Sequence, residues 1–246
     1  MPVCIINIVD FNRRLPGYMP VRQLIWLPFF CGDNAMKNRS IIYIDGFNLY
    51  YGAVKNTPWK WLDMERYFSL LLPDDDIQII KYFTAKILGS HKANQDAYIK
   101  ALSTLNKVQI IYGLFKYKKI KCLVKNCTYR GSRVFDVPEE KRTDVNIAVN
   151  MIKDAINDKC DRFIVVSGDS DLVPAVKAVK VIAPNKKVIV YVPASNRVRG
   201  AANELRNSSD RHKTLPNNLL SKAQFPAQLT DSTGGIIQKP EAWSIE

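Results

Sequence analysis

The stretch RFIVVSGDSDLVPAV, residues 162–176, decides the fold class. Its first part, FIVV, is apolar at every position, which is typical of a strand buried on both faces within a parallel sheet. Gly168 lets the chain turn sharply where this strand ends, and Pro174 suits the first turn of a helix, where its missing N–H costs nothing. A buried strand, a tight acidic loop and a helix in succession predict one repeat of an α/β fold.

Outward from this stretch, short apolar runs alternate with helical periodicity from Arg39 onward. The runs that predict strands are residues 41–45, 77–84, 108–113, 162–167 and 187–192. The segments that predict helices are residues 62–72, 93–105, 144–157, 171–181 and 197–206. Because continuous apolar character requires cover on both faces, the expected architecture is a parallel central sheet between two layers of helices.

The size and charge of the chain narrow the class of protein. Its 246 residues suffice for one sizeable α/β domain with irregular ends. The formal net charge of +13 favours a polyanionic partner, with nucleic acid ahead of a membrane because no segment forms a basic amphipathic anchor. The run LIWLPFF, residues 24–30, falls short of the ~20 apolar residues of a membrane-spanning helix. Five scattered cysteines, with Cys122 and Cys127 the nearest pair, favour free thiols and a reducing cytoplasm.

The same patterns divide the chain into three segments. Residues 1–35 are expected to be a mobile N-terminal extension or the product of a misassigned start, with MKNRSIIYIDGFN opening the domain at Met36. The domain itself is expected to span residues 36–206. Residues 207–246 are polar and repeatedly interrupted by proline and glycine, which predicts a partly disordered tail. The side chains expected to dock this tail are Leu219, Leu220, Phe225 and Trp243.

A basic insertion at residues 114–140 is expected to interrupt the domain as an irregular segment. It interleaves basic with aromatic side chains: Lys116, Lys118, Lys119, Lys121, Lys125, Arg130 and Arg133 with Phe115, Tyr117 and Tyr129. Such a mixture can grip a phosphate backbone and stack unpaired bases, so Lys118, Lys119 and Lys121 are candidate contacts to nucleic acid. A solvated β-hairpin with ordinary aromatic packing is the alternative that the pattern leaves open.

Four aspartates stand where an α/β fold can bring them together. Asp45 ends the run IIYID, Asp169 and Asp171 follow FIVV, and Asp144 opens a predicted helix. Acids at the carboxyl ends of parallel strands share one edge of the sheet, where uncompensated carboxylates repel each other unless a hard divalent cation joins them. The pattern therefore predicts a Mg²⁺ or Mn²⁺ site.

Neighbouring residues bear on the role of each of these four acids. The amide of Asn48 could orient Asp45, and Ser167 could orient a carboxylate or hold a water. Asp144 by itself has another explanation, because an acid in the first turn of a helix, here behind a Thr143 cap, compensates the helix dipole. The expected inner ligands are Asp45 and Asp169, completed directly or through water by Asp144 and Asp171.

Three segments, in their order and spacing, resemble the NYN domain, in its LabA-like branch of the PIN-like nuclease superfamily. They are IDGFNLYYG, EKRTDVNIAVNMIKDA and FIVVSGDSDLVPAVKAVK, and the similarity covers roughly residues 39–206. The resemblance implies a Rossmann-like three-layer α/β/α sandwich with a parallel central sheet, and metal-dependent cleavage of RNA. The family's acidic site falls on Asp45, Asp144, Asp169 and Asp171, and its flanking polar positions fall on Asn48 and Ser167.

The activity that this resemblance implies is that of an endoribonuclease. One or two Mg²⁺ or Mn²⁺ ions bound by the carboxylates would activate a water for in-line attack on a phosphodiester. Lys141 and Arg142, beside Asp144, are then candidate phosphate contacts, with an exposed basic loop as the alternative. The expected partner is single-stranded RNA in the cytoplasm, without a membrane, and homodimer formation is left open.

Two rival functions share part of this pattern. The first is a non-catalytic RNA-binding or regulatory module that holds metal and RNA without turnover. The second is a phosphatase of the haloacid dehalogenase type, in which an aspartate also follows an apolar strand. That chemistry needs a second acid two residues later, where this chain has Phe47.

Overall fold

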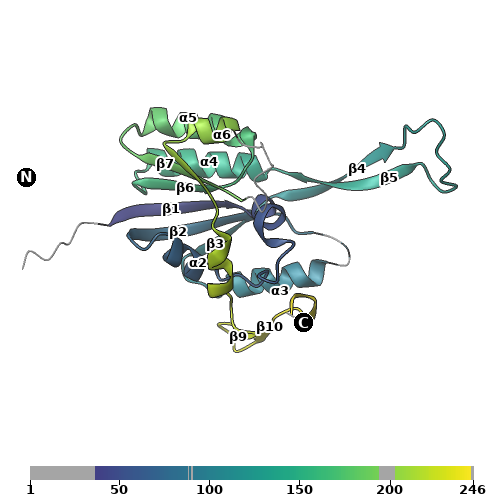
Figure 1. Cartoon of the computed structure of the whole chain (residues 1–246), viewed down its shortest axis with the longest axis horizontal. Coiled ribbons are helices and arrows are strands. Elements are labelled where there is room, and N and C mark those ends of the chain that lie inside the picture. The colour runs from purple at the N-terminus through teal and green to yellow at the C-terminus, as the bar shows by residue number, and fades with distance from the viewer. Residues whose placement is uncertain (1–36, 88, 90, 194–202, 245–246) are drawn as a thin grey trace, which may run out of the picture. The chain divides into compact units, whose positions relative to one another are not determined.

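The computed structural model describes residues 37–87, 89, 91–193 and 203–244, so the expectation for residues 1–35 lies outside the described residues. Met36–Glu246 is one compact unit. Six strands form its parallel sheet in the order β3-β2-β1-β6-β7-β8 (Figure 1). Their bounds are β1 Asn38–Asp45, β2 Asp75–Thr84, β3 Val108–Tyr112, β6 Arg162–Val166, β7 Lys187–Val192 and β8 Arg211–Thr214.

Helices cover both faces of this sheet (Figure 1). On one face lie α2 (Met64–Leu71) and α3 (Lys92–Leu102), and on the other α4 (Thr143–Ile156), α5 (Val173–Ile182) and α6 (Asn203–Ser208). Alternate side chains of β1 enter the two cores, because Ile42 and Ile44 pack toward α2 and α3 while Ile41 and Tyr43 pack toward α4 and α5. The expected three-layer α/β/α sandwich is confirmed.

The strand order marks the edge at which a site is expected. The chain runs outward from the centre of the sheet, through β2 and β3 on one side of β1 and through β6, β7 and β8 on the other. The direction in which the chain moves across the sheet therefore reverses between the two sides. In such sheets ligands bind at the carboxyl ends of the strands, at the point where this direction reverses. Here the reversal lies between β1, which ends at Asp45, and β6, which Ser167 follows directly.

The basic insertion is a regular element and not an irregular segment. Its strands β4 (Leu114–Lys121) and β5 (Val134–Lys141) pair in an antiparallel ribbon, so the hairpin left open by the sequence is the structure that forms. The ribbon extends away from the sheet (Figure 1), and nearly all of its side chains are exposed. Cross-strand neighbours explain why so charged a segment pairs, because Lys119 lies opposite Asp136 and Ile120 opposite Phe135.

The segment after Arg206 belongs to the folded unit and does not form the expected tail. Its strand β8 pairs with β7 and completes the sheet, and β9 (Gln228–Thr230) and β10 (Ile236–Gln238) form a small hairpin. Leu220 and Phe225 are buried, and Trp61 packs on Phe225 with ring centroids 5.7 Å apart. Of the helix expected at residues 197–206, only the part from Asn203 lies within the described residues.

Membrane-spanning helices are absent from the described part of the chain, since none of its helices is long and apolar enough to cross a bilayer.

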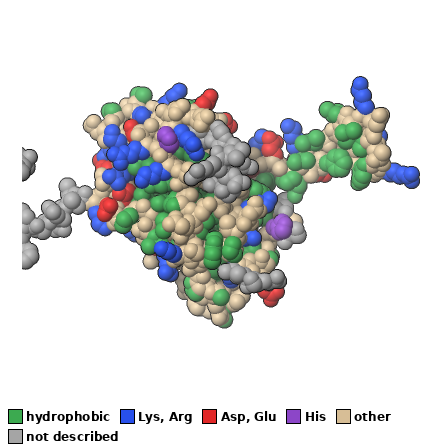
Figure 2. Space-filling model, viewed as in Figure 1, with side chains coloured by type: hydrophobic (Ala, Val, Ile, Leu, Met, Phe, Trp, Pro, Cys, Tyr) green, Lys and Arg blue, Asp and Glu red, His purple; other side chains and the backbone are tan. Residues whose placement is uncertain are grey.

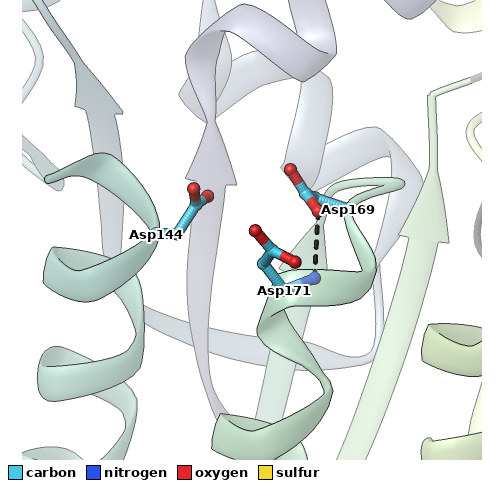
Figure 3. A group of neighbouring side chains, drawn as sticks. All are labelled: Asp144, Asp169 and Asp171. Carbon is cyan, nitrogen blue, oxygen red and sulfur yellow. Dashed lines mark hydrogen bonds between the residues drawn. The ribbon is translucent and has the colours of Figure 1, made fainter. Parts of the chain in front are cut away.

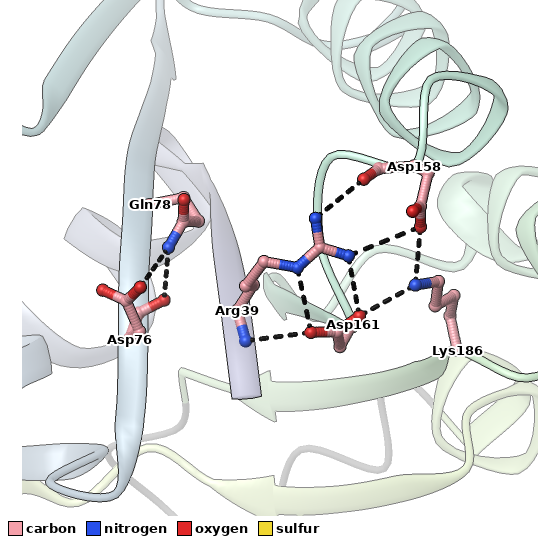
Figure 4. A network of polar contacts seen from close by, with 6 residues as sticks. All are labelled: Arg39, Asp76, Gln78, Asp158, Asp161 and Lys186. Carbon is pink, nitrogen blue, oxygen red and sulfur yellow. Dashed lines mark hydrogen bonds and ion pairs between the residues drawn. The ribbon is translucent and has the colours of Figure 1, made fainter. Parts of the chain in front are cut away.

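The amino-terminal edge of the sheet carries paired charges. Arg39, near the start of β1, donates to the two carboxylate oxygens of Asp161 at 2.9 and 3.1 Å, and Lys186 donates to the same carboxylate at 2.8 Å (Figure 4). Hydrogen bonds from Arg39 and then from Lys186 lower the pKa of Asp161 from its ordinary value. This edge therefore stabilises its carboxylates with cations from the chain itself.

Candidate metal centre

Three carboxylates converge at the opposite, carboxyl edge of the sheet. One oxygen from each of Asp144, Asp169 and Asp171 lies within 4.8 Å of the other two. Figure 3 shows Asp144 reaching from the first turn of α4 toward the two acids that follow β6. Asp144 is thus a member of the group, although a helix dipole would by itself explain an acid at its position.

Local hydrogen bonds in the loop after β6 fix two of these acids. Asp169 caps the short 3₁₀ helix η2 (Ser170–Leu172), and its Oδ1 accepts the backbone N–H of Asp171 at 2.9 Å. The hydroxyl of Ser167 accepts the N–H of Asp169 at 3.1 Å. Both acids are therefore held on one turn whose shape the Asp-Ser-Asp spacing supplies.

The start of α4 differs from the prediction. Thr143 is the first helical residue and not the cap, and its hydroxyl donates to the carboxylate of Glu140. The cap position belongs to Arg142, whose φ of 78° lies in the left-handed region. Such a conformation costs a non-glycine residue about 1–3 kcal/mol. The turn leaves the carboxylate of Glu140 within electrostatic reach of Asp144.

Among the described residues, Asp45 lies beside the group of three and not within it. It is 5% exposed, and its carboxylate accepts the backbone N–H of Asn48 at 2.9 Å, the Asn48 side-chain amide at 3.1 Å and the Ser167 hydroxyl at 3.2 Å. The amide oxygen of Asn48 in turn accepts the N–H of Gly168 at 3.0 Å. Asn48 and Ser167 thus orient Asp45 and tie the end of β1 to the end of β6.

The acids at this edge have none of the pairing seen at the other edge. Within the described residues, no lysine or arginine forms an ion pair with Asp45, Asp144, Asp169 or Asp171. Burial, followed by the charges of the other three, raises the pKa of Asp144 to about 6. Burial also raises the pKa of Asp45. The site therefore concentrates negative charge that the chain itself leaves uncompensated.

Sequence analysis missed a fifth acid, Glu140. Burial, with a smaller contribution from the charges of Asp45 and Asp144, raises its pKa to about 7, while the hydrogen bond from Thr143 acts in the opposite direction. Its position four residues before Asp144, in the segment EKRTD, was an available signal. The direction of its side chain depends on the register of β5 with β4, which the sequence does not display.

The donor set fits a hard divalent cation. Carboxylate oxygens are the ligands that Mg²⁺ and Mn²⁺ prefer, and a cation would offset the burial and the repulsion between acids that together raise the pKa of Asp144. One oxygen from each of three acids is a set that leaves positions for water, which Mg²⁺ usually retains. Asp144, Asp169 and Asp171 could therefore hold one cation, with Asp45 and Glu140 beside it.

Proton release should be coupled to metal binding here. The folded protein holds protons on Asp144 and Glu140 at pH values where the unfolded chain has lost them, so the metal-free protein should lose stability as pH rises from about 4 to about 7. Mg²⁺ binds the ionised acids, so the rise in melting temperature that it causes should be larger at pH about 8 than at pH about 5.

Thermal melts at these two pH values, with and without excess Mg²⁺, measure this coupling. Asp144→Asn should reduce the difference between the two Mg²⁺-induced shifts, because it removes one of the two titrating groups. Equal shifts at both pH values in the unaltered protein would contradict the coupling.

The candidate phosphate contacts do not form one patch. Lys141 is exposed and pairs with a neighbouring glutamate at 2.7 Å, and Arg142 is exposed at the start of α4. Side chains of β4 alternate between the two faces of the ribbon, so Lys119 and Lys121 lie on one face and Lys118 on the other. The sequence grouped these three lysines as one set of contacts, and the alternation of side chains along a strand corrects this by placing Lys118 apart from the other two.

One face of the ribbon leads toward the acids. Phe115 packs edge-on against Phe47 with ring centroids 5.5 Å apart, and Glu140 lies directly opposite Phe115 on β5. We call this the site face, and it continues along β4 with Tyr117, Lys119 and Lys121. The outer face carries Leu114, Lys116, Lys118 and Ile120. Figure 2 shows hydrophobic and basic side chains exposed along the ribbon.

The family match of this chain agrees with the fold. The parallel sheet between helices, with acids at its carboxyl edge, is an α/β sandwich consistent with the PIN-like type. Residues 39–216 match the NYN domain, and the chain belongs to this family. The match extends past Arg206 to the end of β8, as expected if that strand is part of the domain.

Two individual proteins are similar to this chain. The first is 6-hydroxy-3-succinoylpyridine 3-monooxygenase HspA of Pseudomonas putida (strain DSM 28022 / S16), which is 30% identical over 240 residues, covering 83% of this chain and 75% of the relative. The second is a crystal structure of a protein of unknown function from Vibrio parahaemolyticus RIMD 2210633, with a TM-score of 0.48 and 20% identity, covering 74% of this chain and 95% of that one.

Proposed function

We propose that this protein is a metal-dependent ribonuclease that hydrolyses phosphodiester bonds of single-stranded RNA. The observation that carries the proposal is the convergence of Asp144, Asp169 and Asp171 at the carboxyl edge of an NYN-family sheet. Membership of a PIN-like nuclease family supports a hydrolase, and the net charge of +13 supports a polyanionic substrate.

In this proposal, Asp144, Asp169 and Asp171 hold one Mg²⁺ or Mn²⁺ ion. The bound cation supplies positive charge that activates a water and neutralises the leaving oxygen. Asn48 and Ser167 hold the carboxylate of Asp45 in a fixed orientation beside the site. Because burial raises its pKa, Asp45 is suited to accept a proton from the attacking water.

We also propose a branch of the family and a compartment for this chain. We assign it to the LabA-like branch on the three motifs that carry the resemblance, and to the cytoplasm because its five cysteines do not form a disulfide pattern. Of these, Cys122, Cys127 and Cys160 are free in the structure. A homodimer is compatible with this assignment, and size-exclusion chromatography with light scattering measures it directly.

A cleavage assay on labelled single-stranded RNA and the matching DNA, with Mg²⁺, Mn²⁺ or EDTA, tests the activity. We expect RNA to be cut with either metal and to stay intact in EDTA. Binding of RNA without cleavage under every condition would favour the non-catalytic regulatory module. Cleavage in EDTA would reject the metal centre.

We also propose that RNA follows the site face of the ribbon toward the acids. Phe115 and Tyr117 offer rings on which unpaired bases can stack, and Tyr117 is 54% exposed. Lys119 and Lys121 lie farther along the same face, where they can contact phosphates. The outer face has its own two lysines, Lys116 and Lys118, which makes the ribbon its own control.

The double variant Lys119→Ala with Lys121→Ala should weaken RNA binding and make it less dependent on salt. Two phosphate contacts to a single strand contribute about 1.4 to the slope of log affinity against log salt concentration, and the slope should fall by that amount. Lys116→Ala with Lys118→Ala removes the same charge from the outer face and should change the slope much less.

Fluorescence anisotropy of a labelled RNA, titrated at several salt concentrations, measures both slopes. An equal effect of the two double variants would mean that the ribbon contributes only net charge. No effect of either would mean that the ribbon is a solvated hairpin without a role in binding RNA.

A second candidate function is the transformation of a small aromatic compound. The observation that favours it is the length of the similarity to the Pseudomonas protein, because the aligned region covers 83% of this chain. The name of that protein describes oxygenation of a substituted pyridine. Incubation of the purified protein with 6-hydroxy-3-succinoylpyridine in air, with a reduced nicotinamide as electron donor, tests it by loss of the pyridine absorbance. No loss above a protein-free control would reject this candidate.

A further inference from the structure

A cavity of about 370 Å³ opens at the same edge of the sheet as the acids, between α3 and the segment that follows β1. Pockets for small organic ligands span roughly 300–1,000 Å³, so the cavity is large enough for one. It is on the α2 and α3 face of the sheet, because Tyr82 and Tyr98 belong to that core, whereas Asp144 lies on α4. The cavity is therefore distinct from the group of three acids, although Tyr82 in its wall lies within electrostatic reach of Asp45 and Glu140.

Aromatic rings dominate the wall of this cavity. The rings that line it are Phe47, Tyr50, Tyr51, Tyr82, Tyr98 and Trp243. Several of them support one another, since Tyr82 meets Tyr98 edge-on at 6.3 Å and Tyr98 meets Trp243 at 6.0 Å between centroids. Rings fixed by their neighbours offer a flat surface on which a planar ligand can pack. The centroid of a ligand ring would then lie about 4.5–7 Å from a ring of the wall, as in aromatic pairs within proteins.

Among the tyrosines of this wall, Tyr82 is the buried one whose hydroxyl makes no hydrogen bond within the described part of the chain. Tyr82 is 7% exposed, and among the described residues its hydroxyl makes no hydrogen bond, whereas the hydroxyl of Tyr98 donates to the carbonyl of Leu62 at 2.9 Å. Gly46 permits the position of the Tyr82 ring, because a Cβ added there would lie 2.8 Å from its Cζ. The Tyr82 hydroxyl is not one of the fully enclosed polar atoms without a partner, so it is reachable from the cavity and available to bond a ligand.

The charged side chains that line the cavity itself are basic. Among the described residues that line it, Lys55, Lys60 and His91 can carry positive charge, and none is an aspartate or a glutamate. Neither lysine forms an ion pair with a described carboxylate, and Lys55 lies over the ring of Tyr51 with its Nζ 4.9 Å from the centroid. A ligand with a negative group is therefore favoured over a neutral or cationic one.

We propose that this cavity binds a planar aromatic molecule that carries an anionic group, with the ring among the tyrosines, a polar ring substituent on the Tyr82 hydroxyl and the anion toward Lys55 and Lys60. Two sources share this chemistry: a free aromatic acid, and a nucleotide of a bound RNA. The inference goes beyond the proposed ribonuclease and does not depend on it, because it concerns binding on the other face of the sheet.

Titration of the full chain with 8-anilinonaphthalene-1-sulfonate, a fluorescent aromatic anion, tests the site. We expect saturation at one equivalent. Lys55→Ala with Lys60→Ala should weaken binding about tenfold, the effect of losing a charge-assisted contact, whereas the exposed Lys177→Ala should leave it unchanged. The uncharged analogue N-phenyl-1-naphthylamine should lose much less affinity in the lysine double variant.

A blocked cavity provides the second variant. Asn94 lines the cavity from α3, and Asn94→Trp should fill it and abolish binding of both dyes, with circular dichroism as the check on folding. Competition then separates the two sources: displacement by benzoate indicates a free aromatic acid, and displacement by uridine 5′-monophosphate and by single-stranded RNA indicates a nucleotide. Dye binding that is unchanged in both the lysine and the Asn94→Trp variants, or displacement by neither competitor, would overturn the proposal.

The readout separates this inference from the ribonuclease. Dye binding requires neither metal nor RNA cleavage. A protein that binds the dye but does not cleave RNA, and a protein that cleaves RNA but does not bind the dye, can therefore be told apart. Asn94→Trp protein that still cleaves RNA would show that the cavity is not needed to position the substrate.

Discussion

Asp169→Asn should abolish RNA cleavage, lowering its rate by about 10³-fold or more, while the fold stays intact. Such a loss corresponds to about 4 kcal/mol of transition-state stabilisation, a reasonable share for a ligand of a catalytic cation. The substitution keeps the shape of the side chain and an Oδ1 that can accept the backbone N–H of Asp171, a bond now 2.9 Å long. It removes only charge, so loss of activity would report on the metal site.

Asp74→Asn is the matched control for this experiment. Asp74 is an exposed acid just before β2, at the far end of the sheet, and its replacement removes the same charge at a distance from the site. Cleavage rates of the two variants, measured over a range of Mn²⁺ concentrations, should differ by the full expected factor. Activity of Asp169→Asn equal to that of Asp74→Asn would reject the ribonuclease mechanism.

Lys81→Ala should destabilise the protein by about 3–5 kcal/mol, the largest effect on stability that we expect from one substitution. Lys81 on β2 and Asp154 on α4 are each 6% exposed and form an ion pair of 2.5 Å in the core. Asp154 also accepts the hydroxyl of Tyr43 at 2.7 Å. Loss of the lysine leaves a buried carboxylate without its cation, and urea unfolding followed by circular dichroism measures the change.

A hydrophobic replacement of Lys81, Asp154 and Tyr43, which leaves Asn150 in place, separates the ion pair from packing. The triple variant Lys81→Met, Asp154→Leu, Tyr43→Phe leaves no buried charge or hydroxyl and should recover most of the stability lost in Lys81→Ala. Lys92→Ala, which breaks an exposed pair with Asp96 on α3, should cost less than about 0.5 kcal/mol. If Lys81→Ala cost no more than Lys92→Ala, the buried pair would not be the contact that fixes α4 on the sheet.

This network bears on the site through α4. The helix begins beside Asp144 and carries Asp154 near its other end, so the pair with Lys81 anchors the element that presents Asp144 to the loop after β6. The charged pair is also the point at which sequence patterns were least informative. Lys81 interrupts an apolar strand and Asp154 falls on the polar side of a helical repeat, and neither position by itself reveals that the other neutralises it.

The central units of the fold could be predicted because their signals are local. The strands β1, which ends at Asp45, and β6, which ends at Val166, are apolar over consecutive residues. A strand buried on both faces requires that pattern. The polar segment RHKT of β8 has no such signal, since all four residues are exposed, and it joins the sheet only because the edge of β7 offers free hydrogen-bonding groups. The expected tail was therefore wrong for a physical reason.

The sequence by itself determined that acids follow buried strands, and so that a cation-binding edge was to be expected. The tertiary structure decided which acids meet: it gathers Asp144 with Asp169 and Asp171, and holds Asp45 to one side through Asn48 and Ser167. It also brought Glu140 to the site and divided the lysines of the ribbon between two faces. Distances between side chains depend on register and helix packing, which are set by contacts between segments far apart in the chain, whereas strand and helix signals depend on neighbours within it.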